Sequence, residues 1–349
     1  MKRDRDDKSL ALIPKSSAGL TDAGQLTTTR NAAMPKRTSS LPEAYLERPS
    51  RHTSDALSIR FSPTGRFVAT TGMDKIVKVS TGCGYEITSN LLGHRHPVLD
   101  LDWCSDEWLF TSASDGYVTV WDVERAQPLR SVKAHPSGCV INSIATLPKS
   151  TLLLTAGDDA TVRCTDVRVK QTDMKVLEGL YPCTCLASSH DGNTIFVGDI
   201  TGRISVYDFR EGDLMNMLGG HTDVVSCLRA HPDGTTQALL SSAMDGTVRV
   251  WDVKPFVPEG KEQLFVGTGH SHTLSHVQVL PRCAWSRDHK IAIGSGVGPY
   301  SVLLWDDVSR ACRPLPAGHK AVVSAVDLHP YEPIVASCAC DGSLTIQEF

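Results

Sequence analysis

The sequence predicts an all-β protein, a seven-bladed β-propeller preceded by a disordered N-terminal tail. Three observations predict it. Short runs of alternating apolar and polar residues begin near Leu41, turn residues bound these runs, and a Trp-Asp dipeptide or a degraded copy of it recurs along the chain. The recurrence interval is 41–54 residues, which fits one four-stranded sheet per repeat and seven repeats in all.

The N-terminal segment differs in composition from the rest of the chain. Residues 1–38 hold charged and hydroxyl side chains, no aromatic residue and no sustained periodicity, so we expect a disordered tail there and the propeller over 39–349. Short basic stretches at its two ends, such as Lys36-Arg37, are typical both of a solubilising tail and of a nuclear import signal.

Composition excludes several classes of protein. Hydrophobic residues make up 41% of the chain and charged residues 21%, so the chain can bury a sizeable core. The net charge of −4 gives no chain-wide basic field for nucleic acid. No apolar run approaches the roughly 18 residues of a membrane span, and no secretory signal is expected. We therefore expect the eleven cysteines to be reduced thiols.

The repeats follow one another from the first blade to the last. Their anchor dipeptides begin at positions 80, 121, 165, 207, 251, 305 and 347. A Gly-His dipeptide lies early in three of the repeats, at Gly93-His94, Gly220-His221 and Gly318-His319. A period of about 40–45 residues with Gly-His early and Trp-Asp late is the signature of WD40 repeats. The chain is therefore identified as a member of the WD40-repeat family.

Each complete repeat also carries a hydroxyl and an aspartate at fixed distances before the anchor. A buried histidine, a strand hydroxyl, a turn aspartate and the tryptophan are expected to share one hydrogen-bonded network, because buried polar groups need partners. Repeats 2 and 5 hold all four members of this structural tetrad: His94, Thr111, Asp115 and Trp121, and His221, Ser241, Asp245 and Trp251. Repeats 4 and 6 are degenerate, with Thr201 and Pro299 at the aspartate position.

Two features concern the ends and the spacing of the repeats. The chain stops after an inner three-strand set, so residues 44–46 are expected to supply the outer strand of the last blade. The 54-residue step places an insertion between Lys254 and Pro281, which we expect to form a long loop joining blades 5 and 6.

Candidate protein-binding residues follow from these positions. The residue before each turn aspartate should lie on one face of the ring near the channel mouth; these residues are Met73, Ser114, Asp158, Met244 and Cys340. They could equally pack within the channel mouth. In the insertion, Phe256 and Phe265 are candidate aromatic anchors, and Phe256 could instead pack the loop onto blade 5.

Enzyme and metal chemistry are both disfavoured. The Ser/His/Asp sets suggest a hydrolase, but a catalytic site occurs once whereas these sets recur, so no catalytic residue is predicted. A histidine-rich stretch at 270–276 has no cysteine or carboxylate pair beside it at zinc-finger spacing and is interpreted as a solvated loop. The pairs Cys183/Cys185 and Cys338/Cys340 look like metal-ligand pairs, but residues i and i+2 of a strand share one face, so we interpret them as packed small hydrophobic residues. We predict neither a metal nor a cofactor.

Several segments point to one branch of the WD40 family. The run 240–256, which ends in Trp-Asp-Val-Lys-Pro-Phe, resembles the WD40 subunits of the U5 small nuclear ribonucleoprotein, as do 282–286, Gly318-His319 and 329–334. The chain departs from that pattern where Ser80, Thr165 and Tyr207 replace tryptophan. The resemblance implies a nuclear, non-catalytic docking platform in splicing. The implied partners are the large U5 scaffold protein and other spliceosomal proteins. U5 RNA would be associated indirectly, no membrane would be contacted, and the chain would be monomeric within the complex.

A second function remains open at this stage, that of a substrate receptor of a cullin-type ubiquitin ligase. Such receptors resemble one another in a blade that ends Trp-Asp-x-Arg. Here Thr165-Asp166-Val167-Arg168 lacks the tryptophan and Trp251-Asp252-Val253-Lys254 lacks the arginine. Neither segment is a full match.

Overall fold

A computed structural model describes residues 52–81, 87–148, 150–168, 175–254, 262–268, 280–294, 300–316 and 318–349. By its contacts the chain divides into the units Met1–Pro42 and Glu43–Phe349, and every described residue belongs to the second. The predicted tail and its boundary at residue 38 lie outside the described residues. The described part of the chain holds no helix with the length and apolar character needed to cross a membrane.

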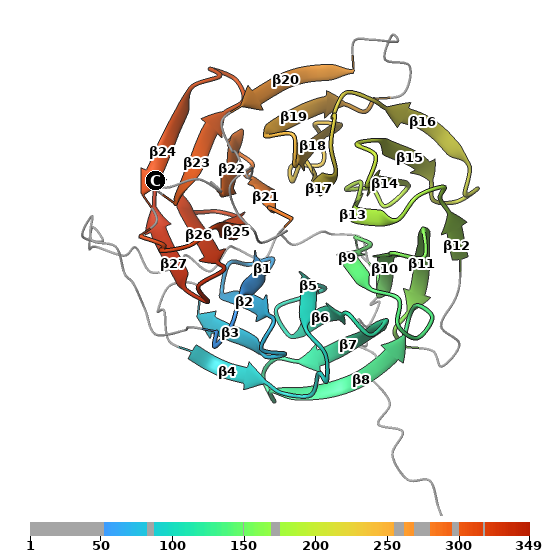
Figure 1. Ribbon diagram of the computed structural model, residues 1–349, viewed down its shortest axis with the longest axis vertical. Coiled ribbons are helices and arrows are strands. Elements are labelled where there is room, and N and C mark those ends of the chain that lie inside the picture. The colour runs from blue at the N-terminus through green and yellow to red at the C-terminus, as the bar shows by residue number, and fades with distance from the viewer. Residues whose placement is uncertain are drawn as a thin grey trace, which may run out of the picture. The chain divides into compact units, whose positions relative to one another are not determined.

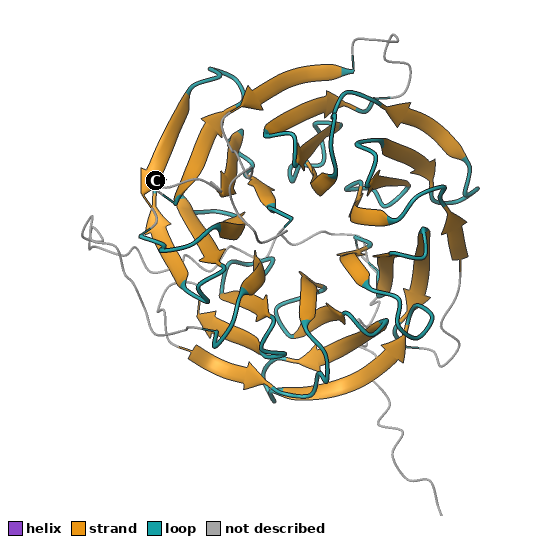
Figure 2. Cartoon of the chain, viewed as in Figure 1, coloured by secondary structure: helices purple, strands orange, loops and turns teal. Residues whose placement is uncertain are grey.

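The described residues form β-strands joined by turns, as the periodicity predicts (Figure 2). In chain order the strands are β1 (Ala56–Phe61), β2 (Phe67–Gly72), β3 (Val77–Thr81), β4 (Ile87–Leu91), β5 (Val98–Trp103), β6 (Trp108–Ala113), β7 (Tyr117–Asp122), β8 (Gln127–Lys133), β9 (Ile141–Thr146), β10 (Leu152–Gly157), β11 (Thr161–Asp166), β12 (Lys175–Glu178), β13 (Cys183–Ser188), β14 (Thr194–Asp199), β15 (Ile204–Asp208), β16 (Leu214–Leu218), β17 (Val225–Ala230), β18 (Ala238–Ala243), β19 (Thr247–Asp252), β20 (Gln263–Thr268), β21 (Cys283–Trp285), β22 (Lys290–Gly294), β23 (Ser301–Asp306), β24 (Cys312–Pro316), β25 (Val323–Leu328), β26 (Ile334–Ala339) and β27 (Leu344–Glu348).

These strands build seven antiparallel sheets, which confirms the seven-bladed propeller. Each of the first six sheets has four strands in sequence order, such as β1-β2-β3-β4 in blade 1. The first strand of every blade contacts the first strands of the two neighbouring blades, in the cyclic order β1, β5, β9, β13, β17, β21, β25 and back to β1. The first strands therefore lie nearest the centre of the ring, and the fourth strands lie at the rim (Figure 1).

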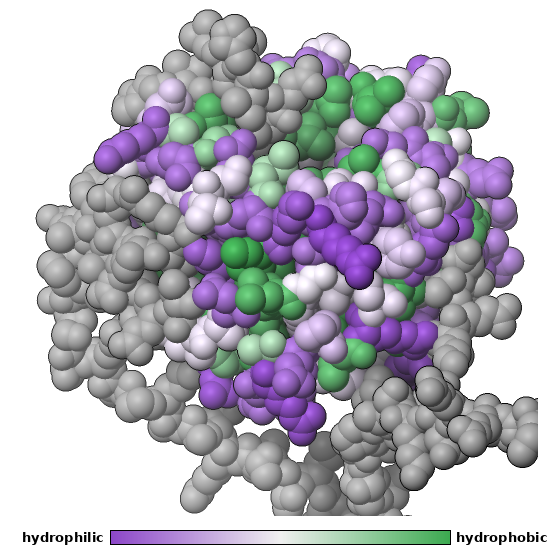
Figure 3. All heavy atoms as spheres, turned by 60° about the horizontal axis from the view of Figure 1, so that its bottom comes forward, coloured by the Kyte–Doolittle hydropathy of each residue, from purple (hydrophilic) through white to green (hydrophobic). Residues whose placement is uncertain are grey.

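The hydrophobic core is divided among the junctions between blades. One buried cluster fills each junction; the cluster between blades 1 and 2, for example, joins Val77 and Val79 to Trp103 and Trp121. Second strands such as Phe67–Gly72 are buried along their whole length because both of their faces pack against neighbouring sheets. Fourth strands are largely exposed. Figure 3 shows one face of the molecule, where hydrophobic residues form separate patches among hydrophilic ones.

Two expectations about strands meet different outcomes. Within the described residues the sheet of blade 7 has three strands, β25-β26-β27, and the predicted donor strand at 44–46 lies outside the described residues. The interpretation of 254–281 as a loop was wrong in part, because Gln263–Thr268 is β20, the outer strand of blade 5. Its side chains alternate between exposed and buried, as expected of a strand, but in the sequence Leu264-Phe265-Val266 is an unbroken apolar run, so the alternation is visible only in the structure.

Candidate functional site: the upper face of the ring

Each blade presents two connections at the same end of its sheet, the loop before its first strand and the turn between its second and third strands. We call this end of the ring the upper face. In blade 5 these connections carry His221 and Asp245, while Ser241 lies on β18 and Trp251 on β19. Antiparallel pairing of β17, β18 and β19 brings the four side chains together.

The four side chains of blade 5 form a continuous chain of hydrogen bonds. The Trp251 indole N–H donates to the Ser241 hydroxyl at 2.8 Å. Ser241 Oγ lies 2.7 Å from His221 Nε2, and His221 Nδ1 lies 2.9 Å from Asp245 Oδ2. Because a carboxylate only accepts, Nδ1 donates to Asp245, and the neutral ring accepts the Ser241 proton at Nε2. Burial lowers the pKa of His221, which favours this neutral ring.

This arrangement has the same residue types as a Ser-His-Asp triad, but its hydrogen bonds are made within the blade and have a structural role. The Ser241 side chain is fully buried, and its oxygen already accepts the tryptophan N–H. The same histidine-to-aspartate and histidine-to-hydroxyl contacts recur in blade 1, between His52, Asp74 and Thr70. The repetition indicates that the constellation orients loops, because in blades 1 and 5 the histidine joins the loop before the first strand to the following turn.

Blade 2 differs from the expected network. His94 Nε2 lies 2.7 Å from Thr111 Oγ1, and the Trp121 indole N–H donates to the same hydroxyl at 2.8 Å. No hydrogen bond joins His94 to Asp115 within the described residues, so the prediction of a complete tetrad in blade 2 was wrong at this link. Instead, Asp115 Oδ1 accepts the backbone N–H of Tyr117. Burial lowers the pKa of His94 to about 4, while the Asp115 carboxylate acts in the opposite direction.

Blades 3 and 7 keep the network in modified forms without tryptophan. In blade 3 the contacts of His135 match those of blade 5, with Asp159 at 3.0 Å and Thr155 at 2.9 Å. In blade 7 a serine hydroxyl lies between the histidine and the aspartate. His319 Nδ1 contacts Ser343 Oγ at 2.6 Å, and the Ser343 hydroxyl donates to Asp341.

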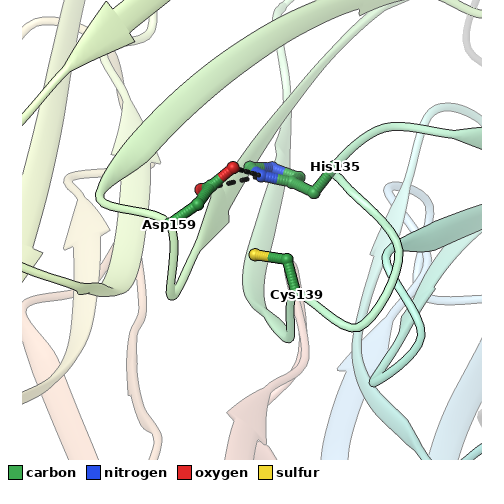
Figure 4. Close-up of side chains that lie close together, drawn as sticks. All are labelled: His135, Cys139 and Asp159. Carbon is green, nitrogen blue, oxygen red and sulfur yellow. Dashed lines mark hydrogen bonds and ion pairs between the residues drawn. The ribbon is translucent and has the colours of Figure 1, made fainter.

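Blade 3 also places a cysteine beside its histidine and aspartate. His135, Cys139 and Asp159 form a group of three possible metal ligands (Figure 4). Both nitrogens of His135 are engaged, one by Asp159 and the other by Thr155. Burial raises the pKa of the Cys139 thiol, which disfavours the thiolate that a metal requires. We therefore interpret this group as the blade network with a thiol beside it.

The predicted upper-face residues occupy equivalent positions. The backbone N–H of each donates to a carbonyl of the loop before the first strand of its own blade, at 2.9–3.1 Å. Met73 and Asp158 are exposed, whereas Ser114, Met244 and Cys340 are half-buried. Burial raises the pKa of Cys340 to about 12. The corresponding residue of blade 4 is Ile200, which was not predicted from the sequence; its N–H donates to the Pro182 carbonyl at 3.3 Å. Ile200 directly precedes Thr201, which occupies the aspartate position of repeat 4, and this spacing could have identified it.

The two phenylalanines of the insertion have different outcomes. Phe265 lies on β20 and is 7% exposed, packed in the cluster between blades 5 and 6. Its proposal as a binding anchor was therefore wrong, because its side chain points into the sheet junction. Phe256 lies outside the described residues.

A buried ion pair that was not predicted from the sequence joins blades across the centre of the ring. Arg282, next to β21 of blade 6, places NH1 2.9 Å from Asp100 Oδ2 on β5 of blade 2. Its NH2 donates to the Asn142 carbonyl of blade 3 at 3.0 Å. Asp100 also accepts the hydroxyls of Ser58 and Ser143. Burial would raise the pKa of Asp100, but Arg282 and the other donors hold it below its usual value. The pair ties opposite blades together.

Comparison with known proteins agrees with this geometry. The family described as WD domain, G-beta repeat matches residues 45–79, 85–122, 126–166, 212–252 and 312–346. The pre-mRNA-splicing factor cwf17 of Schizosaccharomyces pombe is 34% identical to this chain, over 85% of each chain. The human U5 small nuclear ribonucleoprotein 40 kDa protein is 33% identical over 93% of this chain and 90% of its own length. The Dictyostelium discoideum protein of the same name is 28% identical over 85% of this chain and 82% of its own. The chain belongs to the WD40-repeat family and, within it, to the family of U5 small nuclear ribonucleoprotein 40 kDa proteins.

Proposed function

We propose that this chain is a non-catalytic scaffold that mediates protein–protein contacts in the U5 small nuclear ribonucleoprotein during pre-mRNA splicing, in the nucleus. Its membership in the U5 40 kDa family carries the proposal. The structure supports the non-catalytic part, since the histidine, hydroxyl and aspartate sets are hydrogen-bonded in the blades and recur around the ring.

The proposed partners are the large U5 scaffold protein and other spliceosomal proteins. U5 RNA would be associated through them, and the chain would be monomeric within the complex. Met73 and Met244 are the proposed contacts, because methionine side chains adapt to a partner surface and both lie at upper-face turns. Phe256 remains a proposed contact from the sequence alone.

Affinity capture from a nuclear extract at mild salt, followed by mass spectrometry, tests the proposal. We expect the wild-type chain to recover U5 proteins and U5 RNA, and RNase treatment to leave the protein partners bound. The variant Met73→Glu/Met244→Glu should lose this recovery, while Met215→Glu, on the exposed outer strand β16, should keep it. Each variant must first melt like the wild type.

The outcomes separate the alternatives. Failure of the wild-type chain to recover any U5 component would overturn the proposal. Recovery of cullin-ligase adaptors in its place would support the receptor function instead. Undiminished U5 recovery by the folded methionine variant would leave the assignment standing and remove these two residues from the contact surface.

A further inference from the structure

We propose that the upper end of blade 4 is a docking site for a protein segment that carries an apolar side chain between basic residues. The site is built from Leu180, Tyr181 and Ile200, which we call the blade-4 patch. The inference rests on the proposed function only in taking the chain to be an interaction scaffold. It adds where one partner segment binds and which chemistry that segment has.

The three side chains of the patch are exposed at one end of one sheet. Leu180 is 88% exposed, Tyr181 42% and Ile200 44%. Leu180 and Tyr181 lie in the loop between β12 and β13, and Ile200 lies in the turn between β14 and β15. The hydrogen bond from the Ile200 N–H to the Pro182 carbonyl fastens the turn to the loop. The three exposed apolar residues therefore lie on two adjoining connections rather than being scattered over the surface.

The position of Leu180 in this loop is polar in four other blades. In the four blades where the histidine lies four residues before the first strand, the residue after it corresponds to Leu180. Those four residues are exposed and polar: Thr53, Arg95, Thr222 and Lys320. An 88% exposed leucine adds little to folding, because it removes almost no apolar area from water. Its presence at a position where other repeats are polar points to a partner that buries it.

Blade 4 has also lost the network that positions this loop elsewhere. The histidine, hydroxyl, aspartate and tryptophan positions are occupied by Gly179, Val197, Thr201 and Tyr207. Val197 is buried in the apolar cluster between blades 3 and 4. The loop is held instead by backbone contacts, including the Gly179 N–H to the Ala160 carbonyl at 2.7 Å. Its side chains take no part in a blade network.

Two aspartates lie beside the patch, one on each neighbouring blade. On the blade 3 side, Asn142 Nδ2 donates to Asp158 Oδ1 at 2.6 Å and to the Cys183 carbonyl at 2.9 Å, which places Asp158 beside the patch loop. On the blade 5 side, the backbone of Asp223 lies against the turn that follows Ile200. Its main-chain carbonyl would be 3.0 Å from a Cβ atom added at Gly202.

Asp199, the residue before Ile200, adds a third carboxylate to this surface. Within the described residues no ion pair neutralises any of the three. Arg203, at the end of the same turn, offsets one of these charges. The remaining negative charge favours lysine or arginine on both sides of the apolar anchor and disfavours acidic segments.

Selection from a phage-displayed random peptide library on the full-length chain tests this chemistry without a known partner. We expect enrichment of peptides with Leu, Phe or Met flanked by Lys or Arg. Fluorescent synthetic copies of the enriched peptides then give Kd values. Leu180→Ser/Ile200→Ser should weaken binding at least tenfold. Asp158→Asn/Asp223→Asn should weaken it about three- to tenfold and reduce its salt dependence.

The matched control changes exposed apolar residues of the same blade away from the patch. Leu214 and Met215 on β16 are 50% and 58% exposed, so Leu214→Ser/Met215→Ser removes similar side chains from the rim and should leave Kd unchanged. Wild-type melting of every variant shows that lost binding is not lost folding.

Three results would overturn the site: no enrichment, enrichment of acidic peptides, or peptides that bind Leu180→Ser/Ile200→Ser as tightly as the wild type. The capture of U5 components by the wild-type chain is a separate experiment, and it tests the proposed function independently of the patch. If U5 is recovered and the peptide selection fails, the blade-4 patch is wrong and the proposed function stands. If peptides bind the patch and no U5 component is recovered, the patch stands and the proposed function is wrong.

Discussion

Blades 4 and 5 are neighbours and share their strand order and register, yet different buried side chains hold their strands and turns together. Each first strand carries a bulge at the same place, between Cys183 and Cys185 in blade 4 and between Val225 and Cys227 in blade 5. Blade 5 holds the complete network of His221, Ser241, Asp245 and Trp251. Blade 4 holds none of its members. A blade therefore forms without the network, provided that apolar side chains fill the junctions with its neighbours.

The difference shows what the network contributes. In blade 5 the histidine ties the loop before the first strand to the following turn through Asp245, whose carboxylate also accepts the backbone N–H of Thr222. In blade 4 the loop is held by its backbone and exposes apolar side chains. The network fixes a polar loop at the cost of burying polar atoms, and its loss leaves a loop whose side chains are available to a partner.

The largest expected effect comes from removing the tryptophan of blade 5. Trp251 is 2% exposed, so Trp251→Ala should lower the free energy of unfolding by about 3–5 kcal/mol and leave the Ser241 oxygen without its indole donor. Tyr207, the counterpart in blade 4, is half-buried, so Tyr207→Ala should cost clearly less. Urea unfolding of both variants measures the difference. Equal losses would show that the network adds nothing to blade 5.

Two N-terminal deletions test whether blade 7, which has three described strands, is completed to four strands like the other blades. We propose that residues 44–46 complete its sheet. Deletion of residues 1–38 should leave the thermal midpoint unchanged, whereas deletion of 1–50 should destabilise the protein by about 1.5–3 kcal/mol, the value of one large apolar side chain leaving a buried site. Identical thermal midpoints for the two deletions would refute this closure.

A single carboxylate tests the polar part of the network. Asp245→Ala should cost about 1–3 kcal/mol, because His221 Nδ1 and the backbone N–H of Thr222 lose their acceptor. Asp213→Ala, on an exposed turn of blade 4, should stay within about 0.5 kcal/mol of the wild type. An unchanged urea midpoint for Asp245→Ala would show that the Asp245 carboxylate does not contribute to stability.

Asp233 is a poor control for this experiment although it is exposed. Its carboxylate accepts hydrogen bonds from Thr235 and Thr236 and pairs with His231 at 2.8 Å. These donors hold the pKa of Asp233 well below its usual range, against the effect of burial. Asp233→Ala should therefore destabilise the turn after β17.

Counted per histidine and per pH unit, the smallest effect is a dependence of stability on pH that comes from the histidines. Burial lowers the pKa of His94 from 6.5 to about 4 and also lowers those of His52 and His221. The unfolded chain therefore binds protons below pH 6.5 that the folded chain excludes. Stability is fully present above about pH 6.5 and falls as the pH drops toward 4, by at most about 1.4 kcal/mol per pH unit and histidine.

Matched variants isolate the share of one histidine in this pH dependence. Urea midpoints measured from pH 7 to pH 4 should fall less steeply in His94→Gln than in the wild type. His96→Gln, two residues along the same loop and exposed, should keep the wild-type slope. The same slope in all three proteins would show that His94 is protonated equally in the folded and unfolded chains. The lowered pKa of Asp245 acts in a separate window, because its contribution is lost only below its unfolded value of about 3.8.

The sequence by itself determined the architecture and the family. The repeated dipeptides, with Gly-His before them, set the number of blades, because each blade is a local unit whose strands are consecutive in the chain. The members of the blade 5 network were also predictable, since their spacing along the chain is fixed by two hairpins. The missing link in blade 2 was not, because it depends on how the half-buried His94 ring and Asp115 are oriented in space.

Tertiary structure decided the features that join residues far apart in sequence or that depend on exposure. Arg282 and Asp100 are 182 positions apart in the chain. They meet only because the ring closes, and no local sequence spacing predicts this contact. Phe265 and Ile200 are both apolar, yet the first is buried in a junction and the second is exposed at a turn. Which of two apolar residues meets water is set by the packing of the neighbouring blade, so the blade-4 patch became visible only once the seven sheets were assembled.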